Sequence, residues 1–406
     1  MNPLQEYLSS TPVEKVNTSM VAYVANLTKV AEVAPDIASD VVKEFDTQRK
    51  HLKLIASENY CSINTQAAMG NLLTDKYAEG YPAHRYYGGC ENVDSVESTA
   101  AEEAKALFGV DHAYVQPHAG ADANVVAYWA ILNKKIEMPS LEEIGETNLS
   151  HLTDEQWADL RAKLGNQRLL GLDYYSGGHL THGYRQNVSA RMFDAYSYTV
   201  DKETGLLDYD AIEKQAMEVK PLILLAGYSA YPRAINFKRF REIADKCGAV
   251  LMVDMAHFAG LVAGKVFVGE ENPCEWADIV TTTTHKTLRG PRGAIVLCKE
   301  EFAESVNKGC PLVLGGPLPH VMAAKAVAFK EARTQAYQDW AHKVQENARE
   351  LAKECINLGM KLQTGGTDNH LMLIDVTTYG LTGRQAENAM FECGVTLNRN
   401  TLPFDP

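Results

Sequence analysis

The chain has 406 residues, 46% of them hydrophobic and 22% charged, with a formal net charge of −13. This length predicts two or three domains around a sizeable hydrophobic core. The negative charge argues against nucleic acid as a main partner, because binding a phosphate backbone requires clustered lysine and arginine. It leaves room for a local basic pocket that binds one small anionic ligand.

Cysteine usage and the lack of long apolar runs indicate the compartment. The 8 cysteines are scattered without a Cys-x-x-Cys pair, which is typical of reduced cytosolic thiols rather than of disulfides or a zinc site. Residues 1–10 lack a basic start followed by an apolar run, and no window reaches the roughly 18 apolar residues of a membrane span. We expect a soluble, cytoplasmic protein with no membrane partner.

Residues 1–70 are predicted to form an N-terminal helical arm. The sequence Thr11-Pro12-Val13-Glu14 combines a capping box with proline at the first helical position, so a helix is expected to begin there. The helical pattern then continues to about Arg49.

Residues 71–322 alternate between short apolar runs and helical patterns. The runs at 221–227 and 249–254 flank a helical stretch at 237–247 that stops at Gly248. Such alternation predicts a parallel sheet with helices on both faces, whose ligands bind beyond the carboxyl ends of the strands. Asp254 and Lys286 both follow predicted strands, the latter after the apolar run at 277–280.

Two further regions complete the chain. Residues 138–170 interrupt the alternation with a second capping box, Thr153-Asp154-Glu155-Gln156, and Trp157, Leu160 and Leu164 share a helical face that Gly165 can end. We interpret them as an inserted helical excursion that serves packing rather than catalysis. Residues 323–406 combine a long helical pattern with a strand-like run at 371–376, which indicates the start of a smaller C-terminal domain.

Lys286 is the most informative candidate for catalysis. It lies within residues 281–293, among four threonines and beside His285, with glycines and a proline just beyond. A lysine that is desolvated near other cations has a lowered pKa, so its amine can attack a carbonyl. This pattern favours a Schiff-base lysine, and pyridoxal phosphate is the cofactor most often held that way. A polar loop with a solvated lysine is the alternative.

Polar residues elsewhere offer complementary chemistry. Asp254 can hold the proton of a pyridine nitrogen, or can simply cap a helix. The small residues of segment 118–124 leave helix N–H groups free for a phosphate. The two histidines of segment 177–183 suit a neutral ring stacked on an aromatic cofactor, or no special role; a metal would need further ligands, and none is evident. The tyrosines and Glu79 of segment 77–89 suit acid/base work, or a surface aromatic cluster.

Taken together, these segments resemble serine hydroxymethyltransferase, a pyridoxal-phosphate enzyme of the aspartate aminotransferase-like fold (fold type I). The resemblance runs from Leu54-Ile55-Ala56-Ser57-Glu58-Asn59 to the end of the chain and includes Gly315-Gly316-Pro317-Leu318 and Gly366-Thr367-Asp368-Asn369-His370. It implies an α/β fold with a mostly parallel central sheet, helices on both faces, and a smaller α+β C-terminal domain that is incomplete here.

The resemblance also implies residue roles. Lys286 would form the Schiff base with the cofactor, Asp254 would pair with its ring nitrogen, and Glu79 would act as acid and base on the serine hydroxyl and the folate. Further cofactor contacts would come from His179, stacked on the ring, from His257 and Ser229 at its edge, from His285, Gly120 and Ala121 near the phosphate, and from Tyr77, Gly315 and Gly316, which would reach the phosphate of a neighbouring subunit. Substrate contacts would come from Ser57, Tyr87, Arg292 and Asn398.

The implied reaction moves a one-carbon unit from serine to tetrahydrofolate, giving glycine and 5,10-methylenetetrahydrofolate. The implied assembly is a homodimer with shared active sites, or a tetramer built from such dimers, and no metal is implied.

Three departures from the family keep alternatives open. Ala119 and Ala121 stand where the family commonly has serines, the excursion at 138–170 exceeds the usual loop, and the chain stops at Pro406, before the segment with the arginine that grips the substrate carboxylate. A truncated or catalytically weak cofactor-binding homologue is therefore one alternative. A threonine-aldolase-type enzyme is another, although segments 366–370 and 397–400 count against it.

Overall fold

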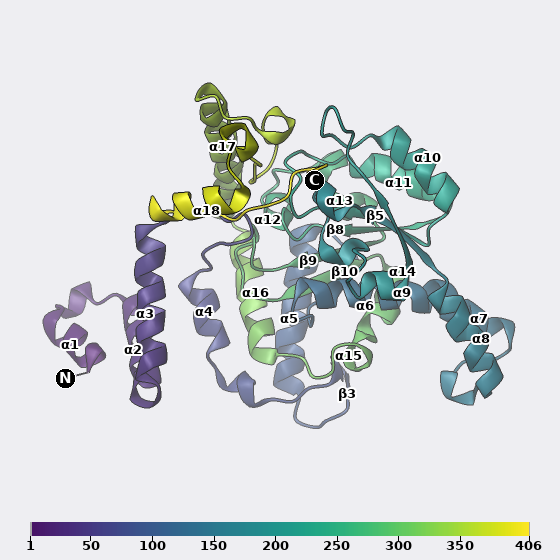
Figure 1. Cartoon of the computed structure of the whole chain (residues 1–406). Helices are drawn as coiled ribbons and strands as arrows, with labels where there is room; N and C mark the ends of the chain where they lie inside the picture. Colours follow the sequence, from purple (N-terminus) through teal and green to yellow (C-terminus); the bar gives the residue numbers. More distant parts are fainter. Residues whose placement is uncertain (1, 406) are drawn as a thin grey trace.

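The computed structural model describes residues 2–405, leaving out the side chain of residue 310. Its N-terminal segment consists of helices α1 (Pro3–Ser10), α2 (Thr18–Val33) and α3 (Pro35–Lys50), which project from the body of the molecule (Figure 1). The predicted helix start at Thr11 is wrong. Residues Val13–Lys15 make only a 3-10 turn without a side-chain cap, and α2 begins at Thr18 because the Asn17 side chain accepts a hydrogen bond from the Met20 amide.

A seven-stranded sheet forms the centre of the body. Its spatial order is β4 (His112–Tyr114), β10 (Ala294–Cys298), β9 (Ile279–Thr283), β8 (Val250–Asp254), β7 (Ile223–Gly227), β5 (Arg168–Leu172) and β6 (Asp194–Tyr198). β10 runs antiparallel to both of its neighbours, and the pairs from β9 to β6 are all parallel. The predicted mostly parallel sheet is therefore confirmed, and β7, β8 and the intervening α11 (Phe237–Cys247) match the predicted strand–helix–strand unit.

Helices cover both faces of this sheet. Alternate residues of β7 point to opposite sides, with Ile223 and Leu225 in one buried cluster and Leu224 and Ala226 in the other. α6 (Gly120–Leu132) and α14 (Glu300–Asn307) cover the first face. α5 (Glu91–Phe108), α10 (Tyr209–Val219), α11, α12 (Ala259–Ala263) and α16 (Pro319–Ala332) cover the second. Burial on both faces explains why these strands are continuous apolar runs.

Short elements connect and extend the body. They are α4 (Ile63–Met69), α9 (Ser189–Met192), α13 (Pro273–Trp276), α15 (Gly309–Leu312), the hairpin of β2 (Gly80–Tyr81) and β3 (His84–Arg85), and the parallel pair of β1 (Leu52–Lys53) and β11 (Val395–Thr396). Among the residues that the structure describes, no helix is both long and apolar enough to cross a membrane.

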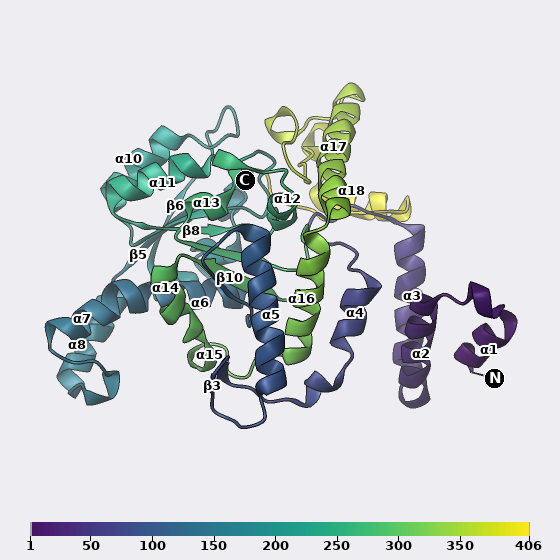
Figure 2. The ribbon, with the colours of Figure 1, turned by 180° about the vertical axis from the view of Figure 1, so that it is seen from behind.

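The excursion after α6 contains α7 (Met138–Glu143) and α8 (Asp154–Gly165), and it projects on the side of the body opposite the N-terminal helices (Figures 1 and 2). The capping box predicted at Thr153 is confirmed, since Thr153 and Gln156 each accept a hydrogen bond from the other's amide. The projection ends before residue 168, because residues 168–170 already belong to β5 of the central sheet.

The C-terminal part begins within α16, which spans the expected boundary between residues 322 and 323, and continues through α17 (Gln335–Asn357) and α18 (Gly383–Glu392). The predicted strand at 371–376 is wrong. Within the described chain this run forms a single antiparallel bridge, Leu362 to Ile374, and Asp375 then caps a 3-10 turn over Val376–Tyr379. An apolar run needs a neighbouring strand to form a ladder, and one bridge does not provide it.

Gly227, the last residue of β7, allows a test of the close packing at the carboxyl ends of the strands. Its φ is +117°, and a Cβ at this position would lie 2.0 Å from the Asp254 carbonyl oxygen. We expect Gly227→Ala to lower the free energy of unfolding by about 3 kcal/mol or more, because strained φ and a backbone clash combine. Gly248→Ala is the matched control: φ is +76° with no atom within 4 Å, so the loss should be about 1 kcal/mol. Urea unfolding measures both, and equal losses would contradict the clash.

Candidate active site

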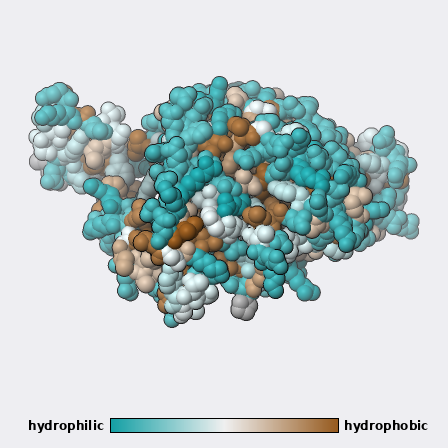
Figure 3. All heavy atoms as spheres, turned by 90° about the horizontal axis from the view of Figure 1, so that it is seen from above, coloured by the Kyte–Doolittle hydropathy of each residue, from teal (hydrophilic) through white to brown (hydrophobic). Residues whose placement is uncertain are grey.

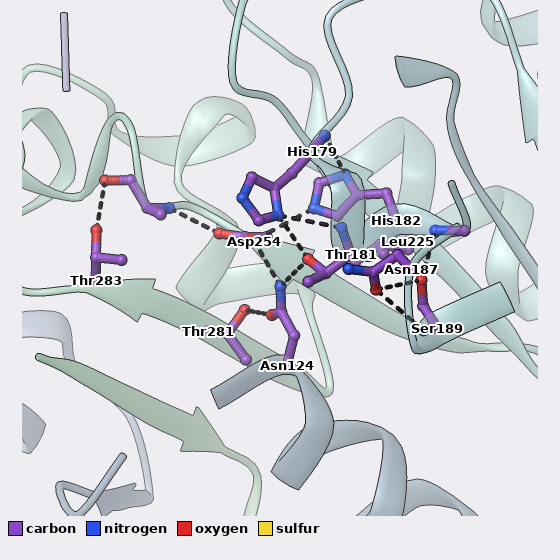
Figure 4. A network of polar contacts seen from close by, with 12 residues as sticks. Asn124, His179, Thr181, His182, Asn187, Ser189, Leu225, Asp254, Thr281 and Thr283 are labelled. Carbon is purple, nitrogen blue, oxygen red and sulfur yellow. Dashed lines mark hydrogen bonds and ion pairs between the residues drawn. The ribbon is translucent and has the colours of Figure 1, made fainter. Parts of the chain in front are cut away.

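Asp254, the last residue of β8, is the centre of a buried polar network (Figure 4). Its Oδ2 accepts a hydrogen bond from Asn124 Nδ2 at 2.9 Å and lies 3.2 Å from His182 Nε2, while Oδ1 accepts from the Ala256 amide at 3.0 Å. Burial alone would raise the pKa of Asp254. The hydrogen bonds and the neighbouring imidazoles outweigh it and lower the pKa below its ordinary range. The carboxylate therefore stays ionised inside the protein.

Asn124 is held by hydroxyl groups from two other elements. Its Nδ2 also donates to Thr181 Oγ1 at 2.7 Å, and its Oδ1 accepts from Thr281 Oγ1 at 2.5 Å. The sequence analysis missed Asn124 as a site residue, although it lies in the segment proposed for phosphate binding. Helix periodicity places it on the same face of α6 as Gly120, four residues earlier, and that spacing was the usable signal.

The loop after β5 carries His179 and His182. Thr181 lies between them and contacts His179 Nδ1 through its amide (3.2 Å) and its hydroxyl (2.7 Å). Burial lowers the pKa of His179 to about 4, so the ring is neutral near pH 7. The sequence analysis found no further metal ligand near these histidines. The structure adds Asp254, with ligand atoms of all three within 4.8 Å of one another, although a structural zinc site takes four ligands.

Lys286 emerges from the neighbouring strand, three residues beyond β9. Burial lowers the pKa of Lys286, Asp254 opposes that shift, and Arg292 adds to it. Its carbonyl oxygen accepts hydrogen bonds from Asn59 Nδ2 and from the Arg289 amide, both at 3.0 Å. Within residues 2–405, no carboxylate forms an ion pair with the Lys286 ammonium. The backbone of the loop is thus held while the amine is desolvated.

Three further imidazoles surround Lys286. The rings of His257 and His370 stack at 5.7 Å, and His257 Nδ1 is buried without a hydrogen-bond partner in the described chain, whereas His370 is influenced by a backbone hydrogen bond at Ala56. Burial, reinforced by the Lys286 charge, lowers the pKa of His370 to about 3 and that of His257 well below 6.5. Burial likewise lowers the pKa of His285 to about 4, with Arg292 and Lys286 adding to it. His370 was not assigned a role from the sequence.

The other expected cofactor and substrate residues lie around this group. A Cβ on Gly120 would lie 2.7 Å from Thr283 Cγ2, so the start of α6 meets the end of β9 closely. The Ser229 amide donates to Gly177 O at 2.8 Å, beside the His179 loop. Ser57 is half-buried, two residues before Asn59, and Arg292 is exposed. We call the residues around Asp254 and Lys286 the first cluster. It contains most of the residues that the sequence analysis assigned to cofactor chemistry.

Glu79 belongs to a second cluster. Its carboxylate accepts hydrogen bonds from Tyr87 at 2.8 Å and Tyr77 at 3.4 Å. Gly315 and Gly316 lie beside it: a Cβ on Gly315 would lie 4.0 Å from Glu79 Oε1, and one on Gly316 would lie 3.1 Å from the Tyr77 ring. Both views show the β2–β3 hairpin at one end of α5 and α12 near the other end (Figures 1 and 2).

Arg85 fixes the backbone around Glu79. Its Nη1 donates to Ala78 O and Gly80 O, both at 2.9 Å, which are the carbonyls on either side of Glu79. Asp94 at 2.8 Å and Glu97 at 2.5 Å balance the charge of the guanidinium. The hairpin that carries Glu79 is therefore clamped by a buried cation.

Asn398 joins neither cluster through a side-chain contact. It is exposed, and its Nδ2 donates to Arg399 O at 3.1 Å. The β1–β11 pair brings the strand just before Asn398 beside the segment that leads to Ser57.

Comparison with known proteins assigns the family. The model of the family described as serine hydroxymethyltransferase matches residues 30–163 and 162–406. The chain belongs to the serine hydroxymethyltransferase family. Its members are fold type I pyridoxal-phosphate enzymes with tetrahydrofolate as co-substrate, which confirms the resemblance, the fold class and the cofactor expected from the sequence.

Several curated relatives carry the same name. The serine hydroxymethyltransferase of Treponema pallidum (strain Nichols) is 70% identical over 403 residues, which cover 99% of this chain and 70% of that protein. Those of Cutibacterium acnes and Mycolicibacterium smegmatis are 58% and 57% identical over 95% and 96% of this chain, and the matched residues cover 79% and 80% of those proteins. These matches favour the transferase over the threonine-aldolase-type alternative.

The buried imidazoles predict acid sensitivity of the cofactor-free chain. In the folded state the pKa values of His179 and His285 are about 4 and that of His370 is about 3, against 6.5 when unfolded. Between these values the unfolded chain binds more protons, so the free energy of unfolding falls as pH is lowered from about 6.5 to about 4.

His370→Phe should make that pH dependence shallower, because one buried imidazole no longer titrates. His342→Phe, the same change at an exposed histidine, should leave the slope as it is. Urea unfolding at several pH values measures the slope, and an unchanged slope in His370→Phe would contradict the assignment.

Proposed function

We propose that this chain transfers the hydroxymethyl carbon of serine to tetrahydrofolate, reversibly, giving glycine and 5,10-methylenetetrahydrofolate, with pyridoxal phosphate attached to Lys286. The observation that carries the proposal is that a desolvated lysine and an ionised, buried aspartate lie at the carboxyl ends of the adjacent strands β8 and β9. Family membership supports the same activity.

The polar groups of the first cluster fit pyridoxal phosphate. Asp254 offers an ionised carboxylate for the protonated ring nitrogen, and Lys286 offers an amine without a competing ion pair in the described chain. His257 Nδ1 is a buried nitrogen that lacks a partner among residues 2–405. The first turn of α6, at Gly120 and Ala121, offers backbone N–H groups for the phosphate.

Each residue has a distinct task in this mechanism. Pyridoxal phosphate, when bound, withdraws electrons from the substrate Cα. Asp254 holds the proton on the ring nitrogen, because its low pKa leaves the proton with the stronger base. Neutral His179 can cover the ring face without placing a second positive charge beside that proton. The lowered pKa of Lys286 raises the fraction of its amine that is uncharged and nucleophilic.

Glu79 is assigned to proton transfer on the substrate hydroxyl and the folate. Its two tyrosine hydroxyl neighbours orient the carboxylate, and Arg85 holds the backbone on both sides of it. Within residues 2–405 no hydrogen bond or ion pair joins Glu79 to Lys286, which supports an active site completed by a second copy of the chain, in a homodimer or a tetramer of dimers. Ser57, Tyr87, Arg292 and Asn398 are assigned to the substrate in that assembly.

Exposed apolar side chains support such an assembly. α2, α3 and the turn that joins them expose Met20, Val33, Ile37, Val41, Val42 and Phe45. Seen from above, a separate group of hydrophobic residues is exposed in the middle of the molecule (Figure 3). Contact with a second copy would cover these residues and remove their apolar surface from water.

The cysteines are consistent with a reducing, cytoplasmic location. Of the 8 cysteines, the 7 described with their side chains are all free thiols. Burial raises the pKa of Cys274 and Cys298 to about 12, so these thiols resist ionisation and oxidation.

Lys286→Ala tests the cofactor attachment. We expect wild-type protein reconstituted with pyridoxal phosphate to absorb visible light, and the variant to lose this band, because the amine proposed to bind the aldehyde is removed. Lys202→Ala, at an exposed lysine, is the matched control and should keep the band. Wild-type protein that stays colourless after reconstitution would overturn the proposal.

Glu79→Gln tests the proton-transfer role. Tetrahydrofolate-dependent cleavage of serine should fall by about 10²- to 10⁴-fold, the usual contribution of a general acid or base. The visible band should be retained, because Glu79 does not hold the cofactor on Lys286. Glu91→Gln, at an exposed residue that begins α5, is the control. A rate close to that of the wild type would contradict the assignment.

A further inference from the structure

Lys325, on α16, is a buried cation that the mechanism above does not use. It is 1% exposed, and its Nζ donates to Val115 O at 2.6 Å, Pro117 O at 2.9 Å and Ala294 O at 2.9 Å. An ammonium has three N–H donors, and all three find a carbonyl oxygen. Within residues 2–405, no carboxylate forms an ion pair with it. Its contacts are therefore directed at the backbone.

The three carbonyls belong to two strand ends beside the candidate phosphate site. Val115 and Pro117 follow β4 and lead through residues 118–119 into α6 at Gly120. Ala294 begins β10, and its amide donates to Pro117 O at 3.0 Å. Lys325 thus joins the end of β4 to the start of β10, under the turn that sets the direction of the first N–H groups of α6.

Close packing leaves this turn little freedom once Lys325 is in place. A Cβ on Gly293 would lie 2.6 Å from Lys325 Cε, and one on Gly120 would lie 2.7 Å from Thr283 Cγ2. The side chains of Ala119 and Ala121 offer no hydroxyl to an anion, and the Ala119 amide already donates to Asp122 Oδ2 at 3.0 Å, so an anion here depends on the N–H groups at the start of α6. The binding strength then depends on how well the turn itself is held.

The charge of Lys325, like its hydrogen bonds, bears on anion binding at this turn. Burial lowers the pKa of Lys325 to about 7, while Glu97 and Asp122 oppose that shift. The three carbonyls also favour the charged form, since a neutral amine has only two N–H donors. The charged form of Lys325 favours an anion at the start of α6, whereas the carboxylate of Asp122 in the same turn opposes one.

The same contacts continue to the hairpin that carries Glu79. Gln116 lies between Val115 and Pro117, whose carbonyl oxygens accept from Lys325, and its Nε2 donates to Gly80 O and Glu97 Oε1, both at 2.8 Å. Glu97 accepts from Arg85, which holds the carbonyls on either side of Glu79. One buried polar chain therefore connects the phosphate turn with the Glu79 hairpin.

We propose that Lys325 is a positioning residue, which holds the turn at residues 117–119 so that the backbone N–H groups at the start of α6 face the cofactor phosphate. The inference rests on the proposed function, because it takes that turn as the phosphate site. It assigns Lys325 to the phosphate alone and not to the aldehyde or the ring.

The test compares two ligands that differ only in the phosphate. The full chain and Lys325→Met are freed of cofactor by dialysis and titrated with pyridoxal phosphate and with pyridoxal, following the visible band. Pyridoxal phosphate should bind the variant about tenfold or more weakly, as expected on losing a charged hydrogen-bond donor, and pyridoxal should bind unchanged. Lys330→Met, at an exposed lysine of the same helix, should match the wild type for both ligands.

Other outcomes are decisive against the proposal. Equal weakening of both ligands, or no weakening of either, would reduce Lys325 to a general scaffold residue and overturn it. If Lys325→Met does not fold, Lys325→Gln replaces it: its amide satisfies two carbonyls, and a smaller loss confined to pyridoxal phosphate is expected. Wild-type protein that binds neither ligand would overturn the proposed function as well, which separates the two failures.

Discussion

The site depends on an ionised carboxylate kept inside the protein. Asp254 lies at a buried strand end, where burial opposes its charge, and the contacts with Asn124, His182 and the Ala256 amide offset that cost. These partners come from α6, from the loop after β5 and from the turn after β8 (Figure 4). The carboxylate is therefore stable only when the central sheet, α6 and the loop after β5 are packed together.

Two buried cations hold backbone carbonyl groups in place. Lys325 binds the carbonyls on either side of Gln116, and Arg85 binds those on either side of Glu79. A cation placed in this way fixes a residue's position without using that residue's own side chain. Glu79 thus keeps its carboxylate available to the tyrosines, and the turn that leads into Gly120 is held without using the N–H groups at the start of α6.

The sequence predicted an element correctly where several independent local signals agreed on it. β7, α11 and β8 were predicted because apolar strand runs, helical spacing and Gly248 all agree. At Thr11 the capping box was the main local signal for a helix start. Asn17 offers a competing start, because its side chain caps α2 through the Met20 amide. The run at 371–376 has strand composition, but a strand also needs a pairing partner, and only one bridge forms in the described chain.

The sequence by itself determined which groups we propose for the reaction, because Lys286, Asp254, His179 and Glu79 lie in motifs whose residue types suit one chemistry. Tertiary structure alone decided which of them meet. It placed Asn124, His182 and His370 in the first cluster and put Glu79 in a second cluster with Tyr77 and Tyr87. Residue type follows from the local chain, whereas contacts between residues 50 or more positions apart, such as Asn124 and Asp254, arise only when buried elements pack.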